Sequence, residues 1–454
     1  MASRTFDAVV IGAGPAGEAC AGRLGKGGLE VALVEEHLVG GECSYYACMP
    51  SKALLRPAEA LDEARRIPGV REAVAGELDV QAALKRRDEV IHNLDDGAQL
   101  PWLDERGVTL VRGAARFDGE RRLLVGDEVL EARTAVVVAT GSDTSVPAIP
   151  GLREAKPWTN REATTAKEVP GRLLVLGGGV SGVELAQAWA SFGSRVAVIE
   201  AMPRLLGREE SFAAELVHAA LVDRGIDVRV GVKAIAASRN GEVGLELETG
   251  DRLAGDELLV AVGRRPRTAQ LGVETIGLEP GEPVEVGETL QSPENEWLYA
   301  IGDVNGRNLL THMGKYQGRI AADRILGKDV KIRDDGGGPP RVIFTEPQIA
   351  AVGHTLASAQ EAGLNVRAVD YGTSDVAGGS FYGRGAPGTT RFVIDHDREV
   401  LVGATFTGAE VAEFVHAATI AIVGEVPLQR LWHSVPSFPT RSEVWLRLLE
   451  TYGL

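Results

Sequence analysis

The sequence predicts an α/β protein, because one pattern of alternating strands and helices occurs twice along the chain. In each copy an apolar strand leads into a glycine-rich turn and a helix, and a second apolar strand ends at an acid. The copies cover residues 9–35 and 174–200. Such alternation favours parallel sheets with helices on their faces. After a glycine- and proline-rich stretch at 336–340 the pattern changes to short strand-like runs and apolar helices, which predicts a C-terminal α+β domain.

Both turns have the spacing G-x-G-x-x-G, and their glycines are Gly12, Gly14, Gly17, Gly177, Gly179 and Gly182. Glycines at this spacing let the backbone turn tightly and approach a pyrophosphate at a helix N-terminus. The acid that ends the second strand, Glu35 in one copy and Glu200 in the other, then accepts a hydrogen bond from a ribose hydroxyl. One such motif is a weak signal, but two in matching context predict two Rossmann-like dinucleotide-binding domains.

Two cysteines, Cys43 and Cys48, follow the first copy closely. A small ring between them would be an exchangeable disulfide, because structural bridges usually close longer loops in cysteine-rich secreted chains. In a regular helix their Cα atoms would be about 8–9 Å apart, too far for a disulfide, so an irregular helix start is expected, where Pro50 is tolerated. Zinc would require further ligands nearby, and two unrelated buried thiols are a second alternative. The pair is therefore predicted to be redox-active.

Two dinucleotides and a dithiol predict an electron path from a nicotinamide through a flavin to a disulfide. Because the first copy runs directly into Cys43, it is expected to hold FAD, and the second copy the nicotinamide. Glu200 favours NADH, since its carboxylate would repel the 2′-phosphate of NADPH, although Arg204 follows closely and leaves NADPH open.

Further motifs extend along most of the chain: Cys48-Met49-Pro50-Ser51-Lys52, Ala139-Thr140-Gly141, Val262-Gly263-Arg264-Arg265-Pro266, Tyr299-Ala300-Ile301-Gly302-Asp303, Leu310-Thr311-His312 and residues 344–353. With them the chain resembles the class I pyridine nucleotide-disulfide oxidoreductases, which include dihydrolipoamide dehydrogenase, glutathione reductase and mercuric reductase. The resemblance implies an FAD-binding domain at 1–150, an NAD(P)-binding domain at 151–280, a return to the FAD-binding central domain at 281–335 and an interface domain at 336–454. The interface domain implies a homodimer.

The resemblance also implies roles for single residues. Cys48 would be the thiol next to the flavin and Cys43 the outer thiol that meets the substrate. Lys52 and Glu184 would form a pair beside the flavin and the nicotinamide, although a solvated lysine and a surface acid are the alternatives. Asp303 would bind the FAD ribitol. The other implied cofactor contacts are Thr140, Gly141, Gly263, Gly302 and His312.

The chain departs from the family at its C-terminal motif, His-Pro-Thr-x-x-Glu, whose imidazole shuttles protons for the outer thiol. Phe438 occupies the histidine position, while Glu443 is retained. Phenylalanine cannot accept a proton, and a positioned acid–base group is typically worth about 10²–10⁴-fold in rate. Tyr45 and Tyr46 are candidates for another proton carrier or for packing residues, and His433 is a weaker candidate.

Composition excludes some partners. The net charge of −16 argues against nucleic acid and anionic membranes. Three cysteines fit a reducing compartment, and the absence of a long apolar run predicts a soluble, cytoplasmic protein. No metal site is expected, because the cluster at 395–398 lies between two strand-like runs and is typical of a hairpin turn. Cys20 is expected to be a small buried residue.

In the C-terminal domain we expect a strand at 341–344, a hairpin of 391–394 and 400–402, and helices at 410–424 and 441–452. The leading hypothesis is an NADH-preferring flavoprotein that passes electrons through Cys43 and Cys48 to an unidentified small molecule, such as an unusual disulfide. Direct reduction of a quinone, metal ion or other acceptor by the flavin, with the dithiol secondary, is the first alternative. A non-catalytic flavoprotein scaffold or redox sensor is the second.

Overall fold

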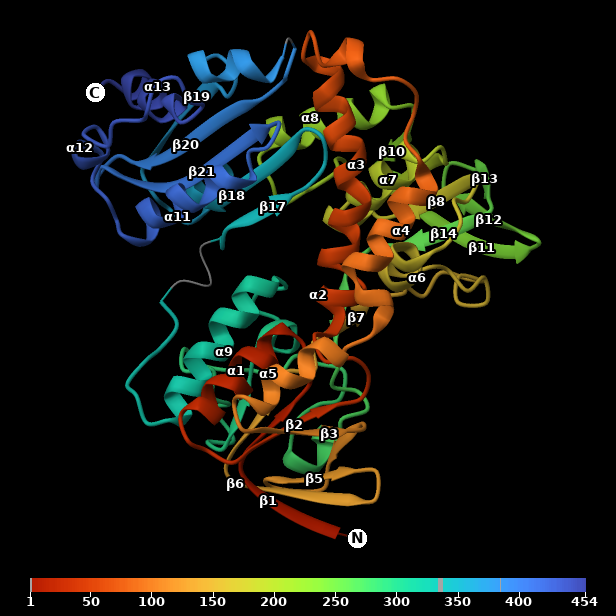
Figure 1. Ribbon diagram of the computed structural model, residues 1–454, viewed down its shortest axis with the longest axis vertical. Coiled ribbons are helices and arrows are strands. Elements are labelled where there is room, and N and C mark those ends of the chain that lie inside the picture. Colours follow the sequence, from red (N-terminus) through yellow and green to blue (C-terminus); the bar gives the residue numbers. More distant parts are fainter. Residues whose placement is uncertain (1, 334–337, 384) are drawn as a thin grey trace. The chain divides into compact units, whose positions relative to one another are not determined.

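The computed structural model describes residues 2–333, 338–383 and 385–454 (Figure 1). By its contacts the chain divides into two compact units. The first comprises Met1–Pro50, Arg87–Ser145 and Gly263–Gly336, and the second Ser51–Arg86, Val146–Val262 and Gly337–Leu454. The expected boundary at 335 and the start of the glycine-rich stretch at 336–340 lie outside the described residues. The boundaries at 150 and 280 stay predictions.

The first unit is built on a mixed sheet with the strand order β3-β2-β1-β6-β5-β4, and β16 also pairs with β6. The strands are β1 (Ala2–Ile11), β2 (Val31–Glu35), β3 (Val108–Arg112), β4 (Ala115–Phe117), β5 (Arg122–Val125), β6 (Glu128–Val138) and β16 (Leu298–Ala300). Strands β1, β2, β3, β6 and β16 pair in parallel. Every residue of β2 is buried, as expected for a parallel strand covered on both faces.

Helices α1 (Pro15–Lys26) and α9 (Thr311–Ile325) lie side by side in this unit (Figure 1). Their contact depends on glycine, because a Cβ atom on Gly318 would be 2.6 Å from the carbonyl oxygen of Ala16. Further elements of this unit are α2 (Gly41–Tyr45), α5 (Leu100–Asp104), β7 (Ser142–Thr144), β15 (Arg264–Pro266) and the 3₁₀ turn Gly302–Asn305. Strand β7 pairs with β15, which brings two distant segments of the chain together.

The second unit contains the second copy of the repeated pattern. Its parallel sheet has the order β10-β9-β8-β14, with β8 (Arg172–Leu176), β9 (Arg195–Glu200), β10 (Asp227–Val230) and β14 (Glu257–Val260). The helices are α6 (Asn160–Thr165), α7 (Val180–Ser191) and α8 (Ser211–Asp223), and an antiparallel sheet follows with β11 (Ala234–Asn240), β12 (Glu242–Leu247) and β13 (Arg252–Gly255). The chain passes from the first unit to the second within helix α3 (Cys48–Arg66) and returns to the first within helix α4 (Val80–Val90). Two copies of one strand–turn–helix–strand unit confirm the predicted α/β class.

The C-terminal segment of the second unit forms an antiparallel sheet with the order β17-β18-β21-β20-β19. The strands are β17 (Arg341–Ile343), β18 (Gln348–Gly353), β19 (Val366–Gly372), β20 (Thr389–Asp395) and β21 (Val400–Gly408), and the helices are α10 (Leu356–Glu361), α11 (Val415–Val423), α12 (Leu428–Leu431) and α13 (Glu443–Tyr452). The hairpin is confirmed, and Asp395 accepts hydrogen bonds from the backbone N–H groups of Asp397 and Arg398 inside its turn.

The two predicted C-terminal helices start later than expected. The helix expected from Glu410 begins at Val415, after a 3₁₀ turn at Ala412–Phe414. Glu410 has φ +49°, a left-handed backbone that does not belong in a right-handed helix. The helix expected from Arg441 begins at Glu443. Among the described residues, none of the helices is both long and apolar enough to cross a bilayer.

Candidate active site

The first glycine turn has the shape of a dinucleotide cradle. Gly12 has φ +100°, and a Cβ atom there would be 2.4 Å from the carbonyl oxygen of Ala139. A Cβ atom on Gly17 would be 1.9 Å from the oxygen of Gly12, so the helix packs directly on the turn. A Cβ atom on Gly14, in contrast, would meet no described atom within 4 Å. The outer glycines are therefore required by packing, and the middle one leaves the open approach that a pyrophosphate needs.

The second turn repeats this geometry. A Cβ atom on Gly177, which has φ +112°, would be 2.4 Å from the oxygen of Ala261, and one on Gly182 would be 2.0 Å from the oxygen of Gly177. Around the position of a Cβ atom on Gly179, no described atom lies within 4 Å. Both turns thus fit a dinucleotide at the N-terminus of a helix, α1 in one case and α7 in the other.

The acids at the ends of β2 and β9 are held in the same way. Glu35 accepts hydrogen bonds from the backbone N–H groups of Ala13 and His37, both at 2.7 Å. Glu200 accepts from Gly178 at 2.6 Å and Met202 at 2.7 Å. A carboxylate offers about four acceptor positions, so each acid retains capacity for a ribose hydroxyl.

Cys43 and Cys48 lie on either side of a break between two helices. Helix α2 ends at Tyr45, Tyr46 has φ −132°, and α3 begins at Cys48 with Pro50 in its first turn. The predicted irregular helix start is therefore observed. The two sulfurs are not joined by a disulfide in this structure. The pKa of Cys43 is raised by its hydrogen bond to Cys48, by burial and by the negative charge of Cys48.

A third residue, Thr311, contacts this pair. Its hydroxyl lies 3.3 Å from the Cys48 sulfur, and its hydrogen bond to Cys43 acts to lower the pKa of that thiol. Thr311 was noted in the sequence only as part of a motif and was not selected as a site residue. Thr311 is the first residue of α9, and a residue at a helix start is a possible anion contact. The residues around Thr311 in the sequence do not indicate, however, that α9 begins beside the two cysteines.

In the second unit, Lys52 and Glu184 form an ion pair, with 2.6 Å between Nζ and Oε2. Glu184 is on α7 and only 3% exposed, and its other oxygen accepts the backbone N–H of Phe344 at 2.9 Å. The alternative of a surface acid is therefore wrong for Glu184, whereas the Lys52 side chain is partly exposed and held in the ion pair. A buried carboxylate is stable only with such partners.

The ribitol candidate Asp303 belongs to a polar cluster in the first unit. The Ser142 hydroxyl donates to its Oδ2 at 2.5 Å, and Arg264 Nε donates to the Ser142 hydroxyl at 2.6 Å. Burial raises the pKa of Asp303, while Ser142 and Arg264 act to lower it. Arg264 also lies 4.0 Å from Glu42, the residue before Cys43. Burial has the larger effect, so the pKa of Asp303 is raised overall, and Ser142 and Arg264 hold its carboxyl group in a fixed place within the cluster.

The remaining cofactor candidates line the surrounding turns. Thr140 donates its hydroxyl to the carbonyl of Arg267, and the N–H of Gly302 donates to the Gln317 side chain. His312 is exposed near the start of α9. Positive φ angles that suit glycine occur at Gly141, Gly263 and Gly302.

The region around Phe438 differs from a proton-transfer site. Phe438 is 76% exposed, whereas Glu443 is buried, and its Oε2 has no hydrogen-bond partner among the described residues. Tyr45 is 1% exposed, its hydroxyl donates to the carbonyl of Val39, and burial raises its pKa to about 12. Tyr45 is therefore a packing residue. Tyr46 is half-buried beside it, and His433 is exposed just after α12.

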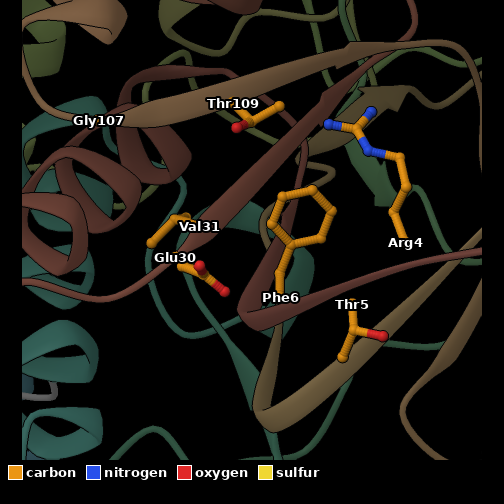
Figure 2. Close-up of a pocket in the computed structure, with 7 residues that line it drawn as sticks. All are labelled: Arg4, Thr5, Phe6, Glu30, Val31, Gly107 and Thr109. Atoms are coloured by element: carbon orange, nitrogen blue, oxygen red, sulfur yellow. The ribbon is translucent and has the colours of Figure 1, made fainter.

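Two further features do not belong to this site. A pocket of about 390 Å³ lies at the amino-terminal ends of β1, β2 and β3, where Figure 2 shows Phe6, Arg4, Glu30 and Thr109 around it. The glycine turn follows the opposite, carboxyl-terminal end of β1, where dinucleotides bind. Within residues 2–333, 338–383 and 385–454 there is no cluster of His, Cys, Asp and Glu that could hold a metal ion.

Comparison with known proteins agrees with this geometry. The pyridine nucleotide-disulphide oxidoreductase model matches residues 6–319, and the dimerisation-domain model of the same family matches residues 339–448. The dihydrolipoyl dehydrogenase of Thermus scotoductus is 34% identical over 450 residues, which cover 97% of this chain and 96% of the relative. The mercuric reductase of Staphylococcus aureus is 29% identical over 446 residues, which cover 96% of this chain and 81% of the relative.

Solved structures include the Cu(II) complex of the HOCl-induced flavoprotein disulfide reductase RclA from Escherichia coli. It superposes with a TM-score of 0.86 at 28% identity, and the match covers 98% of this chain and 99% of that chain. Both the sequence and the structural matches thus extend over nearly the whole protein. The chain belongs to the pyridine nucleotide-disulphide oxidoreductase family, and it is an FAD-dependent flavoprotein oxidoreductase that takes electrons from NAD(P)H.

Proposed function

We propose that this enzyme prefers NADH and relays electrons through Cys43 and Cys48 to an acceptor that requires no proton from an imidazole. The observation that carries the proposal is the exposed Phe438 at the position of the family's proton-shuttling histidine. The dithiol, the two cradles and the Lys52–Glu184 pair support retained redox chemistry. The replacement of the histidine by Phe438 therefore affects one step of the reaction, proton delivery at the outer thiol, Cys43.

Bound FAD would supply two-electron transfer between the nicotinamide and a disulfide. The glycine turn at Gly12 and the carboxylates of Glu35 and Asp303 would hold it, and the turn at Gly177 with Glu200 would hold the nicotinamide. Glu200 supports the preference for NADH, because its carboxylate would face the ribose that carries the 2′-phosphate in NADPH.

Reduction of the disulfide then leaves the two cysteines in different protonation states. Two electrons cleave the disulfide, Cys43 takes up one proton as a thiol, and Cys48 remains a thiolate. The raised pKa of Cys43 and its hydrogen bond to Cys48 support this division of the proton. The Thr311 hydroxyl and the amino terminus of α3 favour negative charge at Cys48. Cys43 is thereby left as the sulfur that meets the acceptor.

We further propose that a redox-active metal ion such as Cu(II) is the acceptor. Reduction of Cu(II) needs an electron and no proton, and thiols are suitable ligands for the Cu(I) product. One NADH supplies two electrons, so two Cu(II) ions would be reduced while the dithiol returns to the disulfide with release of its proton. The Cu(II) complex of the related RclA supports this choice.

An unusual disulfide is the second candidate, because Glu443 is retained and buried at its family position. In either case we propose that the chain acts as a homodimer through residues 339–448, which match the dimerisation domain. By the family resemblance, such a dimer would bring Phe438 of one subunit toward Cys43 of the other.

The test is NADH oxidation with Cu(II), a quinone, lipoamide and glutathione disulfide as separate acceptors. Wild type, Cys43→Ser and Cys20→Ala are compared, because Cys20 is a buried thiol outside the pair. We expect Cu(II) turnover in wild type and Cys20→Ala and its loss in Cys43→Ser. Full turnover of Cys43→Ser with every acceptor would show that the flavin reduces them directly. A flavin-loaded protein without NADH turnover would indicate the scaffold.

A further inference from the structure

Phe344 contacts both members of the Lys52–Glu184 pair. Its backbone N–H donates to Glu184 Oε1 at 2.9 Å, while Lys52 donates to Oε2 at 2.6 Å. The Lys52 ammonium also lies 4.8 Å from the centroid of the Phe344 ring. One residue just after β17 thus occupies one oxygen of the acid and supports the cation that binds the other.

The segment that carries Phe344 is itself anchored on α7. The backbone N–H of Glu346 donates to the Gln187 side chain at 2.8 Å, and Gln187 is 1% exposed. Gln187 lies three residues after Glu184, on the same face of the helix. Two backbone donors of one short segment therefore hold two side chains of α7, which places Phe344 firmly beside the ion pair.

The geometry of these contacts leaves different freedom to the two charges. Glu184 is buried and held by two donors, so its carboxylate has one orientation. The Lys52 side chain is 34% exposed, and besides its bond to Glu184 its ammonium donates a long hydrogen bond, 3.3 Å, to the Ser51 hydroxyl, so a further contact can limit its motion. The aromatic face attracts a cation within about 6 Å, which supplies that constraint.

We propose that Phe344 is a positioning residue for hydride transfer, because its ring fixes the Lys52 ammonium and its N–H fixes the Glu184 carboxylate. The inference rests on the proposed function, in which NADH reduces FAD, and on the location beside both that the family resemblance implies for this pair. Phe344 acts through Lys52 and Glu184 and does not itself exchange electrons or protons.

The test separates the ring from the N–H, since any substitution other than proline retains the latter. Phe344→Leu and Phe344→Met remove the ring, and Phe344→Tyr keeps it. Phe212→Leu is the matched control, because its ring carries Arg391 at 4.8 Å in the same unit without contact to the pair. Stopped-flow reduction of the FAD-loaded enzyme by NADH, its pH profile and the FAD midpoint potential are measured together.

We expect Phe344→Leu and Phe344→Met to slow flavin reduction about tenfold or more, with altered pH profile and potential, since misplaced groups lose rate steeply. Phe344→Tyr should stay close to wild type, and Phe212→Leu should lose only thermal stability. The inference is overturned if Phe344→Leu and Phe344→Met keep the wild-type rate of flavin reduction, pH profile and FAD midpoint potential. This holds even if Glu184→Gln slows flavin reduction, which would leave the proposed function intact. If Glu184→Gln also keeps the wild-type rate, the placement of the pair in the proposed function is wrong as well.

Discussion

The Thr311 hydroxyl lies 3.3 Å from the Cys48 sulfur, and each of the two residues begins a helix. Helices α3 and α9 thus start at the same pair of sulfurs. The positive end of a helix stabilises a nearby anion, and a hydroxyl donor adds a charge-assisted hydrogen bond. Cys48 is therefore in an environment suited to a thiolate, although the two residues are far apart in the sequence.

Replacement of Thr311 by valine should weaken the thiolate at Cys48. Valine has a similar shape and no donor, and a hydrogen bond to a charged group is worth about 1.5–3 kcal/mol, which corresponds to about tenfold or more in the thiolate fraction. In the NADH-reduced enzyme, the long-wavelength charge-transfer absorbance would report the Cys48 thiolate beside the flavin. In Thr311→Val this absorbance should appear at a higher pH than in wild type. Thr311→Ser, which keeps the hydroxyl, serves as control. An unchanged titration in Thr311→Val would contradict this role.

Replacement of Phe438 by histidine should restore part of the missing proton transfer. Glu443 is buried, and its Oε2 has no hydrogen-bond partner among the described residues, so it can orient an imidazole. We expect turnover with lipoamide or glutathione disulfide to rise about 10²-fold, because a positioned base contributes on this scale. Phe438→Leu should show no gain. If the histidine and leucine variants are equally slow, the absent base does not limit disulfide reduction.

The choice of nicotinamide should respond to Glu200. Its carboxylate is fixed at the turn by Gly178 and Met202 and would repel a 2′-phosphate. Glu200→Gln should therefore raise the ratio of kcat/KM for NADPH over NADH about tenfold or more, since like charges at an interface cost several kcal/mol. Glu35→Gln is the matched variant at the first cradle and should weaken FAD retention without change in that ratio. A ratio that Glu200→Gln leaves unaltered would argue against this contact.

The stability of the protein should fall between about pH 4.5 and pH 7 because of Glu18 on α1. Burial raises its pKa from 4.5 to about 7, against the opposing charge of Lys315. A raised pKa favours the protonated acid in the folded state, so this contribution is present below about pH 4.5 and is lost as the pH rises through about 7. Free energies of unfolding should fall less over this range in Glu18→Gln. Glu105→Gln, at a 74% exposed side chain, should follow wild type, and identical slopes for all three proteins would refute the assignment.

Local patterns predicted the elements that depend on neighbours in the sequence. The spacing of Gly12, Gly14 and Gly17 indicated a turn that the structure contains, and Cys43 to Pro50 indicated the break between α2 and α3. These features follow from backbone conformation and packing within a short segment. The late start of α11 escaped prediction, because composition does not report the left-handed conformation of Glu410.

Contacts between distant segments could not be predicted in the same way. Thr311 reaches Cys48, and Phe344 reaches Glu184, only because sheet pairing and helix packing bring those segments together. The burial of Tyr45 is a similar case, since nothing in its neighbours shows that its hydroxyl bonds the carbonyl of Val39. The family resemblance implied Lys52 and Glu184 as a pair, and the structure supplied the residue that holds them.

The most direct test of the electron path is the state of the Cys43 and Cys48 sulfurs before and after one equivalent of NADH. The air-purified, flavin-loaded protein is reduced without oxygen, alkylated, digested and analysed by mass spectrometry. We predict that the peptide containing both residues carries no label before NADH and two labels after it. A protein that oxidises NADH and bleaches its flavin while that peptide stays unlabelled would contradict the relay through the dithiol.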